Sequence, residues 1–321
     1  MEGIQHKTVI VNGNINMHYV EMGQGPIVLF LHGFPELWYT WRHQIPFVAA
    51  SGYRAVAPDL RGFGDTTGAS DDPAAFTMFR VVGDLVALLD SVARSDEDNV
   101  YVVGHDWGAI VAWNLCLYRP DRVKAVLNMS VAFAPRNPKM SPLVALHSTY
   151  GDDYYICRFQ GRGEIEAEFD KIGTKVVLKN FLSYRSPSPL FLPKGKPFGD
   201  SHGETNLPPW LTEEDLDYYT EKFDKSGFTG PINYYRALDM NWELMAPWSG
   251  AQIKVPAMFI VGDLDLTYAV PANREYIHKG GFKRYVPFLR EVVVIKGVGH
   301  FLHEEKPDEV NNHILDFLKN F

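Results

Sequence analysis

Residues 99–109 read Asn-Val-Tyr-Val-Val-Gly-His-Asp-Trp-Gly-Ala, an apolar run that meets a polar residue placed between two glycines. The run Val100–Val103 predicts a short strand buried on both faces, as in a parallel sheet. Residues 110–118 predict a buried helix that stops before Pro120, because a proline disfavours a helical residue ahead of it. The two elements are joined by Gly104-His-Asp-Trp-Gly108, whose spacing is typical of a sharp turn that presents a nucleophile.

The reactive position of this turn is occupied by Asp106. A serine there would need a base to deprotonate it, whereas an aspartate is already ionised at neutral pH. A carboxylate can attack saturated carbon, displacing a halide or opening a strained ether ring, and it is left as an ester that water must hydrolyse. The other interpretation is an aspartate that caps the following helix, a common role at such a junction.

The length and composition of the chain limit the classes of protein to which it can belong. With 321 residues, 46% hydrophobic and 22% charged, the chain has room for one large core and a second, smaller unit. Its net charge of −8 is spread without a basic block, which argues against nucleic acid and an anionic membrane surface as partners. No stretch reaches the roughly 18 apolar residues of a membrane span, and residues 1–7 lack the apolar core of a signal peptide, so we expect a cytoplasmic protein. The only two cysteines, Cys116 and Cys157, are expected to be buried thiols.

Apolar runs that predict strands recur along the chain, at residues 7–12, 15–21, 26–31, 53–57, 124–128, 255–261 and 291–295. The first two runs flank a Gly13-Asn14 turn and predict an antiparallel hairpin. Helical spacing appears at 76–92 and again from Pro307 onward. This alternation is typical of a mostly parallel sheet with helices on both faces.

The alternation fails between about residues 136 and 247, where many prolines interrupt short helical stretches rich in tyrosine. We interpret this segment as an inserted helical lid. The two flanking ranges, 1–135 and 248–321, are then the first and second parts of one α/β core.

The loop His32-Gly-Phe-Pro35 follows the apolar strand predicted at 26–31. In the fold that carries such a nucleophile turn, two backbone N–H groups hold an oxyanion, one from the residue after the nucleophile and one from a loop after an earlier strand. Trp107 and Phe34 occupy these two positions. An ordinary Gly-Pro turn is the alternative for this loop.

Two later strands each end in a possible partner for Asp106. Gly262-Asp-Leu-Asp265 follows the first, and Gly297-Val-Gly-His300 follows the second. The order nucleophile, acid, histidine is that of α/β-hydrolases. Asp263 and His303 are the local competitors for the acid and the base.

Taken together, these motifs resemble those of an epoxide hydrolase of the α/β-hydrolase fold, and the resemblance covers the whole chain. The most similar group is the plant-type soluble enzymes, which have the hydrolase and its lid without the phosphatase domain of the mammalian type. The family spacing falls on Asp265 and His300 rather than on their competitors. The motifs that carry the resemblance are His32-Gly-Phe-Pro35, Gly104-His-Asp-Trp-Gly108, Gly262-Asp-Leu-Asp265 and Gly299-His-Phe301.

In that family two lid tyrosines hold the epoxide oxygen. The matching residues are Tyr155, in Tyr154-Tyr-Ile-Cys-Arg-Phe159, and Tyr235, in Asn233-Tyr-Tyr-Arg236. Residues adjacent on a helix point about 100° apart, so at most one of Tyr234 and Tyr235 is expected to face the pocket. A phenol with a pKa near 10 stays protonated at neutral pH, so it can bind and then protonate an alkoxide.

The resemblance implies a two-step reaction that converts an epoxide to a vicinal diol. Asp106 attacks an epoxide carbon, and water activated by His300, which Asp265 orients, then hydrolyses the ester. His105 and Glu36 adjoin these motifs and are candidates for ordering that water or for a structural role. We expect no metal and no organic cofactor, an aryl or fatty-acid epoxide as the substrate, and water as the second reactant. The oligomeric state is left open.

Two other functions fit much of the same pattern. A haloalkane or haloacetate dehalogenase would use the same Asp-His-Asp set but needs halide-binding N–H donors, and the asparagine that often follows His-Gly in haloalkane dehalogenases is Phe34 here. A hormone-binding receptor of the same fold would sense its ligand without converting it. Such receptors generally keep a serine at the turn, so Asp106 counts against this function.

Overall fold

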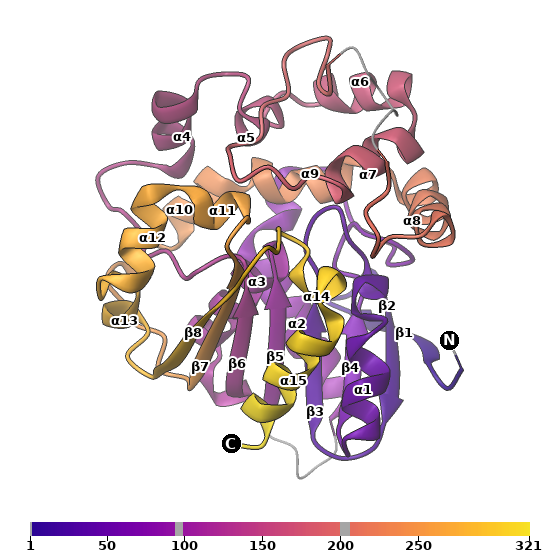
Figure 1. The fold of residues 1–321 in the computed structure, drawn as a ribbon, viewed down its shortest axis with the longest axis vertical. Coiled ribbons are helices and arrows are strands. Elements are labelled where there is room, and N and C mark those ends of the chain that lie inside the picture. The colour runs from indigo at the N-terminus through magenta and orange to yellow at the C-terminus, as the bar shows by residue number, and fades with distance from the viewer. Residues whose placement is uncertain (1, 94–98, 200–205) are drawn as a thin grey trace.

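The computed structural model describes residues 2–93, 99–199 and 206–321 of the chain. In this described part, the strands form one sheet in the order β1-β2-β4-β3-β5-β6-β7-β8 (Figure 1). β1 and β2 pair antiparallel, as do β2 and β4, and all the other neighbours pair parallel. The strands are β1 (Gln5–Val11), β2 (Ile15–Gly23), β3 (Ile27–Leu31), β4 (Arg54–Pro58), β5 (Val100–His105), β6 (Val123–Met129), β7 (Ala257–Gly262) and β8 (Leu289–Ile295).

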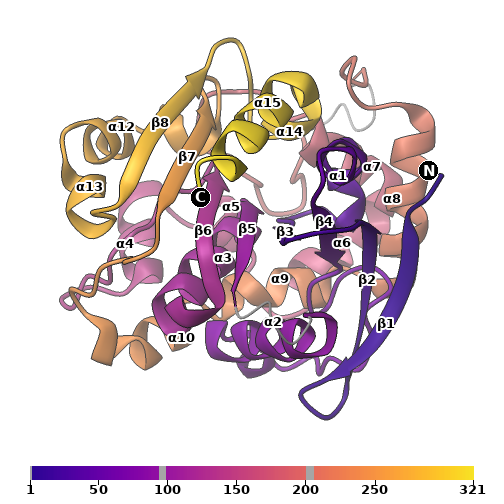
Figure 2. The same cartoon turned by 90° about the horizontal axis from the view of Figure 1, so that it is seen from below.

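The central strands are apolar throughout because both faces of the sheet are covered. In β3, Leu29 and Leu31 belong to the hydrophobic core on one face, whereas Val28 and Phe30 belong to the core on the other. Figure 2 shows α2 and α3 on one side of the sheet and α1 and α15 on the opposite side. The covering helices are α1 (Gln44–Ala50), α2 (Met78–Val92), α3 (Trp107–Tyr118), α12 (Pro271–His278), α13 (Gly281–Tyr285) and α15 (Pro307–Leu318). The predicted mostly parallel sheet with helices on both faces is confirmed.

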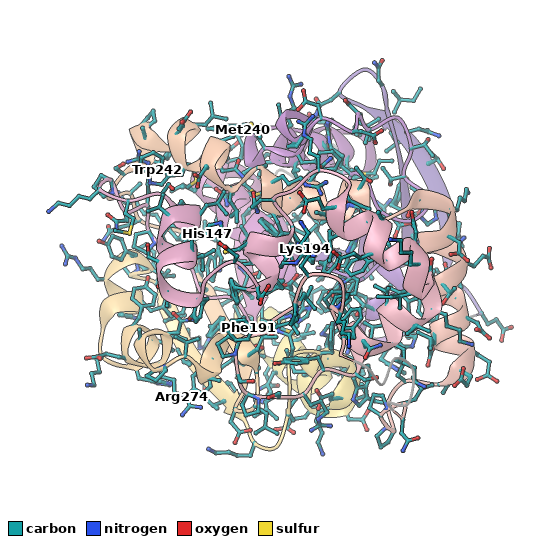
Figure 3. All side chains as sticks on the ribbon, turned by 90° about the horizontal axis from the view of Figure 1, so that it is seen from above. His147, Phe191, Lys194, Met240, Trp242 and Arg274 are labelled. Carbon is teal, nitrogen blue, oxygen red and sulfur yellow. The ribbon has the colours of Figure 1, made fainter. Side chains whose placement is uncertain are left out.

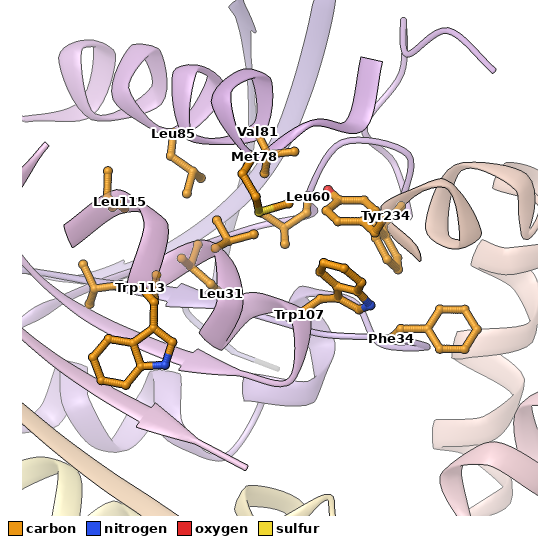
Figure 4. Close-up of a cluster of buried hydrophobic side chains, with 14 of the residues drawn as sticks. Leu31, Phe34, Leu60, Met78, Val81, Leu85, Trp107, Trp113, Leu115 and Tyr234 are labelled. Carbon is orange, nitrogen blue, oxygen red and sulfur yellow. The ribbon is translucent and has the colours of Figure 1, made fainter. Parts of the chain in front are cut away.

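Residues of α2, α3 and β3 form the hydrophobic core next to the carboxyl ends of the central strands. Figure 4 shows Met78 and Val81 of α2 close to Leu31 of β3, with Trp107 of α3 beyond them toward Phe34. All five side chains belong to the same buried cluster. This packing fixes the start of α3 against the end of β3.

At the turn that carries Asp106, two element ends differ from the sequence prediction. β5 continues to His105 rather than ending at Val103, because Gly104 and His105 still pair with Asn128 and Met129 of β6. α3 begins at Trp107 rather than at residue 110. Backbone pairing needs no apolar side chain, so the strand runs up to the turn itself. The turn is therefore tighter than the sequence pattern suggested.

The segment between β6 and β7 forms a layer of helices that lies above the sheet in Figure 1. Figure 3 looks onto this layer from above, with His147, Phe191 and Lys194 on the near face. Its longest helix, α8, begins with a capping box in which Thr212 and Asp215 satisfy each other's backbone N–H groups. The helices of this layer are α4 (Pro142–Tyr150), α5 (Tyr155–Arg158), α6 (Glu164–Ile172), α7 (Thr174–Leu182), α8 (Glu213–Ser226), α9 (Thr229–Arg236) and α10 (Leu238–Leu244).

Short helices occupy several of the connections. They are η1 (Trp38–Trp41), η2 (Pro73–Phe76), η3 (Pro120–Arg122), η4 (Ala246–Trp248), α11 (Leu266–Ala269) and α14 (Leu302–Glu305). Cys116 and Cys157 are both free and buried, as predicted. Among the described residues, no helix combines the length and the apolar character needed to cross a membrane.

Candidate active site

The turn between β5 and α3 places Asp106 at the carboxyl end of the sheet. Asp106 has φ +51°, a left-handed conformation that residues other than glycine seldom adopt. Both flanking glycines are needed, because a Cβ on Gly108 would lie 1.9 Å from the carbonyl oxygen of Leu31, and one on Gly104 would lie 2.6 Å from that of Gly108. The turn therefore has the strained, close-packed geometry of a nucleophile elbow.

The side chain of Asp106 does not cap α3, so the helix-cap interpretation is wrong. Its Oδ1 instead accepts the backbone N–H of Phe34 at 2.8 Å. Gly33 makes this approach possible, because a Cβ there would lie 2.4 Å from the same oxygen. The carboxylate thus points into the space between the two loops that follow β3 and β5.

His300 lies between two carboxylates. Its Nδ1 is 3.1 Å from each oxygen of Asp265, and its Nε2 is 3.4 Å from Oδ2 of Asp106. Burial disfavours the imidazolium, but the two carboxylates outweigh burial and raise the pKa of His300 well above its ordinary value. Burial also opposes the ionised form of Asp265, but His300 outweighs it and lowers the pKa of Asp265. Of the three residues predicted from chain order, His300 therefore contacts both carboxylates.

Asp265 is fixed by the helix that it begins. It is the N-cap of α11, where Oδ1 accepts the backbone N–H of Thr267 at 2.8 Å and the hydroxyl of the same residue at 2.9 Å. The two competitors have other partners. Asp263 accepts the N–H of Gly297 at 2.7 Å, and Nε2 of His303 lies 2.6 Å from the hydroxyl of Thr40.

Tyr155 and Tyr235 come from two different lid helices and line one cavity together with Asp106 and His300. Their ring centroids are 5.7 Å apart, in an edge-to-face arrangement. Burial raises the pKa of both phenols well above the ordinary value, and the nearby carboxylate of Asp106 raises each further. Both side chains therefore stay protonated over the whole physiological range and can act as donors.

Tyr234 points away from this cavity, as the helical geometry predicted. Its hydroxyl donates to the carbonyl oxygen of Arg61 at 3.0 Å, on the loop after β4. Gly62 and Gly230 pack backbone to backbone at the same place, since a Cβ on Gly62 would lie 3.0 Å from Cα of Gly230. These contacts fix the rotation of α9, so its next residue, Tyr235, faces the cavity.

The rest of the cavity wall is largely apolar and comes from both layers. Phe181, Tyr184 and Leu190 from the lid close it on one side. The sequence did not identify these residues, because apolar and aromatic residues of a lid have the same pattern as its packing core. The core supplies the remaining wall residues: Phe34, Pro35, Leu266, Thr267 and Phe301.

The two predicted oxyanion donors differ in what they contact. The N–H of Phe34 already donates to Asp106, as described above. Trp107 is the first residue of α3, so its N–H is one of the helix-terminal donors that have no partner within the helix. Its indole ring packs edge-to-face on Tyr235, with centroids 5.0 Å apart. The two N–H groups therefore come from the two loops, after β3 and after β5, that flank the carboxylate.

His105 and Glu36 adjoin the backbone of His300 and Gly33 and are fully buried. Nδ1 of His105 is 2.8 Å from Oε2 of Glu36, and its Nε2 is 2.8 Å from the carbonyl oxygen of His300. The same carboxylate oxygen accepts the N–H of Gly33 at 2.7 Å. Burial opposes the charge on Glu36, but His105 and His303 outweigh it and hold the pKa of Glu36 well below its ordinary value. These contacts tie the loop after β3 to the loop that carries His300.

Two clusters in the described residues contain enough carboxylates and imidazoles to suggest a metal: Glu36, His105 and His303, and His18, Asp59 and Asp65. In each cluster the donor atoms already pair with one another or with protein cations. Nδ1 of His18 lies 2.8 Å from Asp59, and Lys222 lies 2.7 Å from Asp65. We assign no metal to either cluster.

Comparison with known proteins gives a consistent result. Residues 26–307 match a family described as the alpha/beta hydrolase fold. Epoxide hydrolase 1 of Siraitia grosvenorii is 56% identical over the whole of both chains, and epoxide hydrolase A of Mycobacterium tuberculosis is 37% identical over 98% of each. The solved structure of epoxide hydrolase I from potato (Solanum tuberosum) superposes with a TM-score of 0.95 at 57% identity, covering 99% of this chain and 100% of that one.

Proposed function

We propose a mechanism for this chain from the premise that it belongs to the α/β-hydrolase family and is an epoxide hydrolase. One observation carries the proposal. His300 bridges Asp265 and Asp106, and His300 and Asp106 line one cavity with two buried, protonated tyrosines. A nucleophile, a base and two acids therefore surround one small space.

In the first step, a carboxylate oxygen of Asp106 attacks one carbon of the epoxide ring and the bond from that carbon to the ring oxygen breaks. Tyr155 and Tyr235 stabilise the departing oxygen, and one phenol transfers its proton to it. The product is an ester between Asp106 and the ring-opened substrate, which now carries one hydroxyl group. The raised pKa values of both phenols support this assignment, because a tyrosine that is already ionised has no proton to give.

In the second step, His300 takes a proton from water and the resulting hydroxide attacks the ester carbonyl of Asp106. The N–H groups of Phe34 and Trp107 hold the tetrahedral oxyanion. The ester bond then breaks, and the diol leaves with the proton that His300 took from water. The acid formed at Asp106 gives the second proton of that water to the tyrosine that donated in the first step, so Asp106 is again a carboxylate and both phenols are protonated.

The charge of Asp106 links the two steps. In the free enzyme, that carboxylate is one of the groups that raise the pKa of His300. Formation of the ester removes this negative charge, so the imidazole loses part of the stabilisation of its protonated form. A larger fraction of His300 is therefore neutral in the ester intermediate, where the reaction needs a group that can accept a proton from water.

The apolar wall supports an aryl or fatty-acid epoxide as the substrate, because aromatic and aliphatic carbon fits Phe34, Phe181 and Leu190 without leaving polar groups unpaired. A second, more apolar groove is lined by residues that include Trp107 and Ile110. We assign residues 136–247 to the lid and residues 1–135 and 248–321 to the core. A cytoplasmic location stays a prediction from the sequence.

The test is a panel of aryl and fatty-acid epoxides, incubated with the protein after treatment with a chelator and analysed for diols. We expect the wild-type protein to form vicinal diols without added metal. The Asp106→Asn variant should form none. Release of halide from haloalkanes, with no diol from any epoxide, would contradict the proposal.

A further inference from the structure

An ion pair between a half-exposed arginine and a buried carboxylate joins the lid to the region that carries His300. The carboxylate of Glu305, at the end of α14, is only 3% exposed, and its Oε2 lies 3.1 Å from Nη1 of Arg185, which follows α7 in the lid. Nη2 of the same guanidinium donates to the carbonyl oxygen of Gly297 at 2.9 Å. One lid arginine therefore contacts both the start of the His300 loop and the helix that follows it.

The other oxygen of Glu305 holds this loop directly. Its Oε1 accepts the N–H of Gly299, the residue before His300, at 3.0 Å. A Cβ on Gly299 would lie 2.7 Å from that oxygen, so a larger residue there would displace the carboxylate. The carbonyl of His300 accepts from His105 at 2.8 Å and from the hydroxyl of Ser130 at 3.1 Å. Hydrogen bonds thus fix the backbone on both sides of His300, and Glu305 accepts the one from the preceding residue, Gly299.

Arg185 is needed to keep this carboxylate in place. Burial raises the pKa of Glu305, while the Gly299 N–H and the Arg185 guanidinium oppose that rise. Removal of the guanidinium would leave a buried carboxylate without a counter-charge, which is unfavourable. Glu305 would then take up a proton or turn toward solvent, and Gly299 would lose its charged acceptor.

The same lid segment also forms part of the cavity wall. Phe181 and Tyr184 precede Arg185 and Leu190 follows it, and all three line the cavity with Asp106 and His300. The arginine therefore lies on the piece of chain that a bound substrate touches.

We propose that the Arg185–Glu305 pair is a positioning device that couples the lid to His300, holding the imidazole in place for ester hydrolysis while this lid segment is seated on the core. The inference rests on the proposed function, because it concerns its second step. Formation of the ester needs no base, since a carboxylate attacks without losing a proton, so loss of the pair slows hydrolysis of the ester and spares its formation.

The test measures the two steps separately by rapid-quench mass spectrometry of the full chain under single-turnover conditions. Arg185→Met removes the charge, and Glu305→Gln keeps an acceptor for Gly299 but removes the ion pair. We expect hydrolysis of the ester to slow about tenfold in both variants, with formation of the ester within about twofold of wild type. Arg185→Lys restores part of the lost rate.

Arg162→Met is the matched control, because Arg162 also pairs a lid guanidinium with a core carboxylate, Asp72, but both side chains are exposed and neither contacts the His300 loop. We expect both steps to be unchanged in this variant. Unchanged hydrolysis in Arg185→Met, or equal slowing of both steps, overturns the coupling. If Glu305→Gln does not fold, Arg185→Met decides alone, since the Arg185 side chain is 38% exposed.

Failure of the proposed function would look different. If wild type and His300→Gln both form no ester at any time point, the two-step mechanism is wrong. The proposed coupling of the lid to His300 is then wrong as well. If His300→Gln accumulates ester while Arg185→Met behaves like Arg162→Met, the mechanism stands and only the coupling is wrong.

Discussion

Nε2 of His300 lies 3.4 Å from Oδ2 of Asp106, so the imidazole faces a carboxylate where a serine hydrolase has a hydroxyl group. In a serine hydrolase the histidine is needed for the first chemical step. In the proposed mechanism the nucleophile is a carboxylate, which attacks without losing a proton, and the histidine acts only after the ester has formed. This difference makes the two steps separable by mutation.

His300→Gln is expected to react once with substrate and then stop. Mass spectrometry after incubation with an epoxide should show the protein heavier by one substrate, attached at Asp106. Asp106→Asn is the control and should carry no adduct, because the amide is a poor nucleophile. Full turnover in His300→Gln, or absence of an adduct in a variant that still binds substrate, would show that His300 is not the base.

Tyr155→Phe and Tyr235→Phe are each expected to slow ester formation by about 100-fold, since one donor to a developing oxyanion contributes about 3 kcal/mol. The double variant should be slower still. Single-turnover measurements on the epoxide used for wild type provide the rate.

Tyr234→Phe is the control for these two variants, because Tyr234 adjoins Tyr235 but donates to Arg61 instead of facing the cavity. It should lose about 1 kcal/mol of unfolding free energy, the contribution of one hydrogen bond, and keep its rate of ester formation. The tyrosine assignment fails if Tyr234→Phe slows alkylation while the other two variants do not.

The fold and the reaction class could be read from the sequence because their determinants are local. The glycines around Asp106 are required by contacts of 1.9 to 2.6 Å within one turn and its neighbouring strand, so they leave a fixed spacing in the chain. The ends of β7 and β8 carry Asp265 and His300 in an order that the fold imposes. The fold and the epoxide hydrolase function are confirmed, whereas the individual roles of the site residues stay predictions.

Contacts between distant parts of the chain could not be read in the same way. Arg185 and Glu305 are far apart in the sequence, and an arginine or a glutamate carries no signal of which partner it meets. The same holds for Thr40, whose hydroxyl contacts both Glu36 and Glu304. These pairings follow from how the lid and the loops dock, which depends on packing rather than on local pattern.

The raised pKa of His300 predicts how folding stability depends on pH. A histidine with a folded pKa above its unfolded value of about 6.5 stabilises the fold fully below that pH. The contribution is lost as the pH rises from about 6.5 through the folded pKa, with a slope of at most about 1.4 kcal/mol per pH unit. Urea unfolding of wild type and His300→Gln between pH 6 and pH 9 measures it. The difference in unfolding free energy between the two proteins should fall with rising pH, and a constant or growing difference would contradict the shift.

Gly108→Ala should damage both stability and activity, because the added Cβ would lie 1.9 Å from the carbonyl oxygen of Leu31. Backbone atoms of β3 cannot move aside as a flexible side chain can, so α3 must shift away from the strand, at a cost of about 3 kcal/mol. Since α3 begins next to Asp106 and β3 leads to Phe34, the shift also lengthens the 2.8 Å contact between the Phe34 N–H and the carboxylate.

Gly83→Ala is the comparison, because this glycine lies inside α2 and a Cβ there meets only the side-chain amide of Asn12, at 3.1 Å. Alanine favours a helix over glycine by about 1 kcal/mol, which offsets the small displacement of that amide. Denaturant unfolding and single-turnover rates should therefore show a large loss of both stability and activity in Gly108→Ala and a change of less than about 1 kcal/mol in Gly83→Ala. If Gly108→Ala retains wild-type stability and wild-type rates of both steps, then the close approach of α3 to β3 does not hold the nucleophile in place.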